Sequence, residues 1–155
     1  MSDNKRPIPE SEYRTIAEYV PIVSVDLLVF HSGGLLLLRR ENEPAKGEWF
    51  VPGGTVLKRE TLRQAVHRVA NEELGVDVLI DDELGVYEHF YDATETAGVS
   101  TKQYLATAFL VTPVSDQFTT DDQHSEITVM SKPFPDLHNY VERYIRDLRS
   151  CGYQF

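Results

Sequence analysis

The sequence predicts one α/β domain built on a mixed β-sheet with helices on both faces. Short runs of β-branched and other apolar residues outnumber the helical segments, which is typical of a domain organised around a sheet. Two segments, 60–74 and 134–148, instead repeat apolar residues at the helical spacing. The chain has 155 residues, of which 41% are hydrophobic, so it has the size and apolar content of a single core.

An N-terminal arm precedes this domain. Residues 1–19 are polar and are interrupted by two prolines, so we expect a loose arm with a short helix from Glu12 to Tyr19. The single domain then covers residues 20–155. Its strands are expected at residues 20–30, 35–38, 49–51, 55–57, 76–80, 84–91, 104–111 and 126–129. The first two strands are joined by the turn sequence HSGG and therefore predict a hairpin.

Two helices complete the domain. The helix at 60–74 follows a Pro-Gly-Gly turn and is stopped by Gly75, a residue type that commonly follows the last helical turn. The last helix begins near Pro133 and continues to Leu148 with one apolar stripe, which should pack on the sheet. Asp26 interrupts the first strand, and the pattern alone assigns it an outward or edge position.

Charge and cysteine content exclude several classes of function. The chain has 15 Lys and Arg residues against 25 Asp and Glu residues, a formal net charge of −10, so we expect no general attraction for nucleic acid or for an anionic membrane. No apolar run approaches the roughly 20 residues of a membrane span, and the N-terminus lacks a secretory apolar stretch. The single cysteine, Cys151, fits a reducing compartment. We therefore expect a cytoplasmic protein that holds any anionic ligand by local groups.

The end of the helix at 60–74 carries a pair of carboxylates, Glu72 and Glu73. They border the apolar stripe and lie where the helix dipole is negative, so they are repelled by the helix end and by each other. A divalent cation would offset both effects. Mg²⁺ prefers such oxygen ligands, and a carbonyl of the Pro-Gly-Gly turn could complete the site. The alternative is a solvated pair at a frayed helix end that contacts Arg68 one turn earlier.

A fixed pattern of residues extends from the glycine turn to the end of this helix. It comprises Gly54, Glu60, Arg68, Ala70, Glu72, Glu73, Gly75 and Val76. This spacing resembles the Nudix box, the loop-helix-loop motif of the Nudix hydrolase family. The resemblance implies a Nudix-like α/β/α sandwich and a bound Mg²⁺ ion, with Mn²⁺ as the alternative. One position departs from the common box, because Val69 stands where many members have a glutamate that binds metal or acts as the base.

Outside the box, most of residues 20–130 are similar to the GDP-mannose mannosyl hydrolase branch of that family, which also lacks this glutamate. The similarity is carried by the sequences VSVD, GEWFVPGG, EHFYD and DQH, and by Arg40 and Tyr104. The resemblance implies a homodimer that acts on a nucleoside diphosphate sugar. Thr55 departs from the branch, which usually has an arginine directly after the paired glycines.

The same resemblance assigns roles to individual residues. The implied metal ligands are Gly54 through its carbonyl, Glu72, Glu73 and Gln123. The implied catalytic residues are His124 as the general base, with Arg40 and Asp26. The implied substrate contacts are Arg40, Arg68, His89, Tyr104 and Asp26.

These residue types suit such roles, since a neutral imidazole can accept a proton from water and guanidinium groups bind phosphate well. Taken alone, the same residues also fit structural roles. Those roles are a solvated loop histidine for His124, a strand-end cap for Arg40, a satisfied core histidine for His89 and a core ring for Tyr104.

The sequence supports one leading function and two alternatives. The leading function is Mg²⁺-dependent hydrolysis of a nucleoside diphosphate sugar of the GDP-mannose type, with water attacking the anomeric carbon. The first alternative keeps the fold but attacks phosphorus in a substrate such as ADP-ribose. The second is a nucleotide-binding domain without turnover, which the departures at Val69 and Thr55 keep open.

Overall fold

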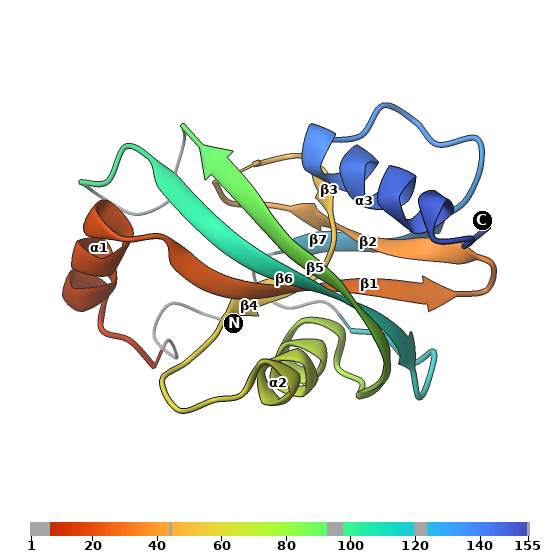
Figure 1. Cartoon of the computed structure of the whole chain (residues 1–155), viewed down its shortest axis with the longest axis horizontal. Coiled ribbons are helices and arrows are strands. Elements are labelled where there is room, and N and C mark those ends of the chain that lie inside the picture. Colours follow the sequence, from red (N-terminus) through yellow and green to blue (C-terminus); the bar gives the residue numbers. More distant parts are fainter. Residues whose placement is uncertain (1–6, 44, 93–97, 120–123, 155) are drawn as a thin grey trace.

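The computed structural model describes residues 7–43, 45–92, 98–119 and 124–154, with only the backbone at 124 and 125. Figure 1 shows the order of the elements along this described chain. They are α1 (Glu10–Tyr19), β1 (Ile22–His31), β2 (Gly34–Arg40), β3 (Trp49–Phe50), β4 (Gly53–Thr55), α2 (Leu62–Leu74), β5 (Val78–Tyr91), β6 (Lys102–Pro113), β7 (His124–Met130) and α3 (Asn139–Ser150). Within the described ranges, every helix is too short or too polar to cross a membrane.

The strands form a mixed sheet in the order β3-β2-β1-β6-β5. β1 runs parallel to β6 from Ile22 to Val29, and the remaining described pairs are antiparallel. β4 pairs with β1 next to Asp26, and β7 pairs with β2. The antiparallel pairing of β1 with β2 across the HSGG turn confirms the predicted hairpin.

α2 and α3 cover opposite faces of this sheet (Figure 1). Successive residues of a strand point to opposite faces, so Leu27 belongs to the core cluster under α2 and Leu28 to the cluster under α3. Val66 and Val69 supply the apolar face of α2, as the spacing predicts. The arrangement confirms the predicted α/β/α sandwich with helices on both faces of a mixed sheet.

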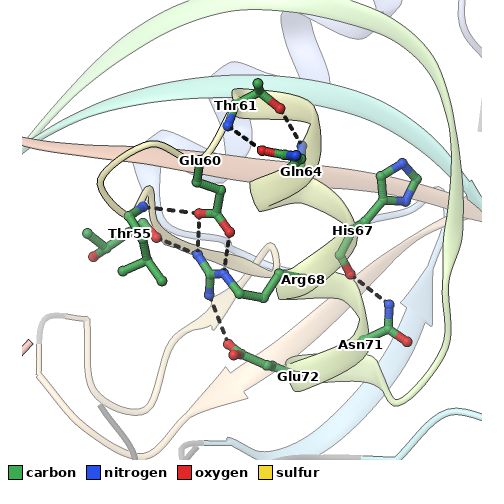
Figure 2. Close-up of polar contacts among 9 residues, drawn as sticks. Thr55, Glu60, Thr61, Gln64, His67, Arg68, Asn71 and Glu72 are labelled. Atoms are coloured by element: carbon green, nitrogen blue, oxygen red, sulfur yellow. Dashed lines mark hydrogen bonds and ion pairs between the residues drawn. The ribbon is translucent and has the colours of Figure 1, made fainter. Parts of the chain in front are cut away.

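The ends of α2 follow from local sequence. Thr61 caps the first turn, because its hydroxyl accepts from the Gln64 N–H at 3.1 Å while the Gln64 side chain accepts from the Thr61 N–H at 2.9 Å (Figure 2). Gly75 ends the helix in the left-handed conformation, with φ of 70°. The helix therefore stops directly after Glu72 and Glu73, as predicted.

α1 is packed rather than loose. It begins at Glu10, earlier than expected, and buries Tyr13 and Ala17 against Ile22 and Val99. The two buried residues are four positions apart and share one helix face. This part of the predicted arm is therefore an ordered wall at one end of the sheet (Figure 1), while the domain boundary after it stays a prediction.

Several predicted boundaries were wrong. The strand expected at 55–57 lies at Gly53–Thr55 (β4), because the glycine turn itself pairs with β1. The strands expected at 76–80 and 84–91 form one strand, β5. Its pairing with β6 continues across the polar residues between the two predicted strands, because a bulge lies on either side of Asp82 and Glu83. The last helix begins at Asn139 and not near Pro133. Pro135 disfavours helical geometry in the residue before it, and His138 caps the first turn, because its Nδ1 accepts from the Tyr140 N–H at 3.1 Å.

Candidate active site

One pocket is lined by residues of α1, of the strands β1 to β6 and of the C-terminal half of α2. Eight of the ten predicted site residues line it, namely Asp26, Arg40, Gly54, Arg68, Glu72, Glu73, His89 and Tyr104. Gln123 lies outside the described residues, and of His124 only the backbone is described. The fold thus brings the predicted residues together, while their individual roles stay predictions.

The Pro-Gly-Gly turn lies against both α2 and β1. The Gly53 N–H donates to Glu73 Oε1 at 2.7 Å, and Gly53 pairs with Asp26 across the β1–β4 ladder. A Cβ added to Gly53 would collide with the Asp26 carboxylate, and one added to Gly54 would lie 2.8 Å from a methyl group of Val69. Both positions need glycine, and the close approach holds the Glu73 carboxylate next to the turn that carries the Gly54 carbonyl.

Arg68 joins α2 to the loop before it (Figure 2). Its Nε and Nη2 donate to the two oxygens of Glu60 at 2.7 and 2.9 Å. Nη2 also donates to the Thr55 carbonyl at 2.7 Å, and Nη1 donates to Glu72 Oε2 at 3.1 Å. The bidentate hydrogen bonds raise the pKa of Arg68 and lower the pKa of Glu60. Arg68 therefore supports the loop and orients Glu72 from one side of the pocket.

Replacing Arg68 by Lys is expected to lower the free energy of unfolding by roughly 1–3 kcal/mol, because lysine keeps the charge but cannot make the forked contact with Glu60 and reach the Thr55 carbonyl as well. Urea unfolding measures the change. R63K, at an exposed position of the same helix, is the control for an arginine-to-lysine change. Equal unfolding energies for the two variants would contradict this role of Arg68.

Glu72 and Glu73 differ in their surroundings. Glu73 is only 8% exposed, so the alternative of a solvated pair is wrong for this residue. Glu72 is on the surface and makes the predicted contact with Arg68, yet it also lines the pocket. Among the described residues, no three His, Cys, Asp or Glu side chains form a group that could hold a metal ion by themselves. Glu72, Glu73 and Gly54 all line the pocket, and carboxylate and carbonyl oxygens are hard ligands of the kind that Mg²⁺ prefers.

Asp26 is buried, so the outward or edge position expected from the pattern was wrong. It is 7% exposed, and the Tyr144 hydroxyl donates to its Oδ2 at 2.5 Å. Burial raises the pKa of the Asp26 carboxyl from 3.8 to about 7, although the hydrogen bond from Tyr144 and the charge of Arg40 both lower it. An acid is tolerated in this central strand because it has a hydrogen-bond partner there.

The D26N variant is expected to be more stable than the wild type above pH 7. The folded carboxyl keeps its proton up to about pH 7, whereas the unfolded one loses it near 3.8, so the wild type loses stability across that window, on the order of a few kcal/mol. Asparagine carries no charge and still accepts from Tyr144. Urea unfolding between pH 4 and pH 8 tests this, with the exposed D136N as control. Parallel stability curves for wild type and D26N would be the contrary result.

Aromatic rings surround His89 on the side of the pocket that faces α3. His89 is buried and stacks on Tyr140, with ring centroids 4.2 Å apart. Tyr91 packs edge-on against Tyr104 at 5.8 Å, and both rings line the pocket. Burial lowers the pKa of His89 to about 4, so the imidazole is neutral at pH 7 and acts there as a hydrogen-bonding group.

Sequence reasoning missed two contributions to the site. Pro7, Ile8 and Tyr13 line the pocket from the segment expected to be a loose arm, and the spacing of Tyr13 and Ala17 was the available signal. Tyr144 was counted only as part of the apolar stripe of the last helix. No sequence signal paired its hydroxyl with Asp26, because the two residues are 118 positions apart.

Arg40 lies at the end of β2, where its backbone pairs with that of His124 in β7. The register shifts between Arg39 and Arg40, which is a local irregularity at the edge of the pocket. Val69, in contrast, is 1% exposed within the core of α2. At this position α2 therefore has a buried apolar side chain, where the common Nudix box has a carboxylate.

Comparison with known proteins extends these observations. The NUDIX domain family matches residues 20–143. The chain is 57% identical over 138 residues to a low-salt glycan biosynthesis protein, Agl8, of Haloferax volcanii, a match that covers 89% of this chain and 88% of that protein. It is also 35% identical over 85 residues to an ADP-ribose pyrophosphatase of Methanocaldococcus jannaschii, which covers 54% of this chain and 50% of that protein.

The fold agrees with solved structures. A MutT protein from Methanosarcina mazei has a TM-score of 0.68 and 27% identity, over 84% of this chain and 96% of that protein. A NUDIX hydrolase from Nitrosomonas europaea has a TM-score of 0.65 and 23% identity, over 86% and 74%. Nudix hydrolases generally use divalent metal ions such as Mg²⁺ and act on nucleoside diphosphates linked to another group. Because the family match spans residues 20–143, the chain belongs to the Nudix hydrolase family.

Proposed function

We propose that this chain is a Mg²⁺-dependent hydrolase of a nucleoside diphosphate sugar of the GDP-mannose type. Water attacks the anomeric carbon and releases the nucleoside diphosphate and the free sugar. The observation that carries the proposal is one pocket that combines carboxylates, arginines and a buried Asp-His pair. The Haloferax volcanii relative is named as a glycan biosynthesis protein, which supports a substrate that contains a sugar.

The metal ligands in this proposal are Glu73, Glu72, the Gly54 carbonyl and Gln123. Among the described ligands, Glu73 is the most rigidly positioned for metal binding, because the Gly53 N–H donates to one of its carboxylate oxygens and the side chain is buried. A bound Mg²⁺ ion would neutralise negative charge on the diphosphate that leaves. Mn²⁺ presents a similar preference for oxygen ligands and is the alternative metal.

Other pocket residues bind the phosphates and the sugar, and His124 accepts the proton from water. Arg40 and Arg68 line the pocket with positive charge, and Arg40 suits a phosphate oxygen of the leaving group. Asp26, His89 and Tyr104 offer hydrogen bonds and a ring to the sugar. His124 takes the proton of the attacking water, since Val69 has no group that could accept it.

Hydrolysis of a panel of nucleotide sugars with Mg²⁺ in oxygen-18 water tests the proposal. Carbon attack leaves the nucleoside diphosphate unlabelled, and proton NMR taken early in the reaction shows the inverted anomer of the sugar. Attack on phosphorus instead places the label in a phosphate group, which would favour the ADP-ribose type of reaction. The absence of any product would favour a nucleotide-binding domain without turnover.

The resemblance also supports a homodimer, and the composition supports a cytoplasmic protein without a nucleic acid or membrane partner; we include both in the proposal. The acidic composition, with a net charge of −10, agrees with the lack of a nucleic acid partner. Sedimentation velocity of the full chain tests the dimer, since a monomer at micromolar concentration would contradict it.

A further inference from the structure

The hydroxyl of Tyr144 lies between two buried residues of the pocket. It donates to Asp26 Oδ2 at 2.5 Å and lies 3.4 Å from His89 Nε2. Asp26 and His89 line the pocket, but within the described part of the chain Tyr144 is not among the lining residues. It belongs to α3, and its side chain is fully buried on the face of the helix that packs in the core. Tyr144 therefore contacts the pocket residues from behind.

Two aromatic rings pack against the ring of Tyr144 and hold it in place. The ring packs edge-on against Tyr87 at 4.6 Å and against His89 at 5.8 Å. One helical turn earlier, Tyr140 stacks on His89, and its hydroxyl bonds to the backbone of Phe90 through both the N–H, at 2.7 Å, and the carbonyl, at 2.9 Å. Two residues of α3 therefore contact His89: Tyr140 packs on one face of the ring, and the Tyr144 hydroxyl lies next to Nε2.

Tyr144 brings the last helix into contact with two strands at once. The residues that Tyr144 contacts come from β1 and β5, so the last helix connects two strands of the pocket that are not neighbours in the sheet. A helix that belongs to the core cluster therefore also carries a polar group toward the site.

We propose that Tyr144 is a positioning residue that fixes the Asp26 carboxylate and one tautomer of His89 for binding the sugar of the substrate. This inference rests on the proposed function for the identity of the ligand. Above pH 7, where the Asp26 carboxyl is ionised and can only accept, Tyr144 donates its single proton to Asp26, and its oxygen is then an acceptor for an N–H on His89 Nε2. His89 then carries its proton on Nε2, and Nδ1, 3.8 Å from Asp26 Oδ2, is a hydrogen-bond acceptor.

The Y144F variant tests this assignment, because it removes the hydroxyl and keeps the ring. With GDP-mannose as the probe, kcat/KM is expected to fall roughly tenfold, the effect typical of losing a hydrogen bond to a charged group. The inhibition constant of GDP should stay within about twofold, because GDP lacks the sugar that Asp26 and His89 would bind. Equal losses for GDP-mannose and GDP would contradict a role specific to the sugar.

Y87F is the matched control. The Tyr87 hydroxyl donates to Asp147 at 2.8 Å, so this variant also removes a tyrosine–aspartate hydrogen bond from the same aromatic cluster, but outside the pocket. Y87F is expected to keep the kcat/KM of the wild type. A similar loss in both variants would show that α3 has only a structural effect.

A second measurement needs no substrate. Long-range ¹H–¹⁵N spectra of ¹⁵N-histidine protein at pH 8 report the protonated ring nitrogen, and H89Q assigns the His89 signals. Wild type and Y87F should show His89 with its proton on Nε2, and Y144F should show a mixture of tautomers. An unchanged tautomer in Y144F overturns the proposal. If no nucleotide sugar is hydrolysed by the wild type, the proposed function fails while this spectrum still decides the role of Tyr144.

Discussion

Replacing Glu73 by Gln is expected to reduce kcat by on the order of 10²–10³-fold, since one ligand charge of the Mg²⁺ site is lost. Glutamine keeps a carbonyl oxygen that can accept from the Gly53 N–H, so the glycine turn should stay in place. The effect is therefore electrostatic. E72Q is expected to reduce kcat less, because Glu72 is more exposed and its charge is partly compensated by the ion pair with Arg68.

Thermal unfolding with and without Mg²⁺ separates metal binding from folding. Without metal, E73Q should match or exceed the wild-type Tm, because it removes a carboxylate from the negative end of α2. With millimolar Mg²⁺ the wild type should gain stability by mass action, and E73Q should gain much less. If E72Q loses both the metal-dependent gain and the activity while E73Q keeps them, the two carboxylates have exchanged roles.

The part of the site that could be predicted from the sequence is the part that is local. The glycine turn, α2 and Gly75 follow one another in the sequence, which suggests a cation site between the turn and the end of the helix, and the structure places Glu73 against Gly53. The capping of α2 by Thr61 and the fork between Arg68 and Glu60 were not predicted, although they also join residues within about two helical turns of one another. Local geometry of this kind follows from helix periodicity and fixed loop length.

The part that could not be predicted depends on pairing over long distances. Asp26 interrupts an apolar run, and in isolation that pattern suggests a position facing water. Its partner Tyr144 comes from the last helix, and only the parallel pairing of β1 with β6 and the packing of α3 place the two side chains together. The same holds for α1, whose wall of the pocket exists because Tyr13 docks against Ile22 and Val99.

The general base is the remaining assignment with a large expected effect, and it must be a residue other than the one at position 69. Val69 packs in the core against the glycine turn and has no group that accepts a proton. The backbone of His124 lies opposite Arg40, a residue that lines the pocket. A base on this strand would act close to the arginine that we assign to the leaving group.

H124A is accordingly expected to lower kcat by roughly 10²–10⁴-fold, the usual contribution of a positioned base, with little change in Tm. H67A is the control, since His67 lies on the exposed face of α2 and bonds to Asp77. A neutral imidazole is the active form, so the wild-type rate should rise with pH through the range where histidines titrate, and this rise should vanish in H124A. Because the Asp26 pKa is about 7, D26N must be measured as well. A rise that persists in H124A but is lost in D26N would assign the titration to Asp26, and full activity in H124A would remove His124 from the mechanism.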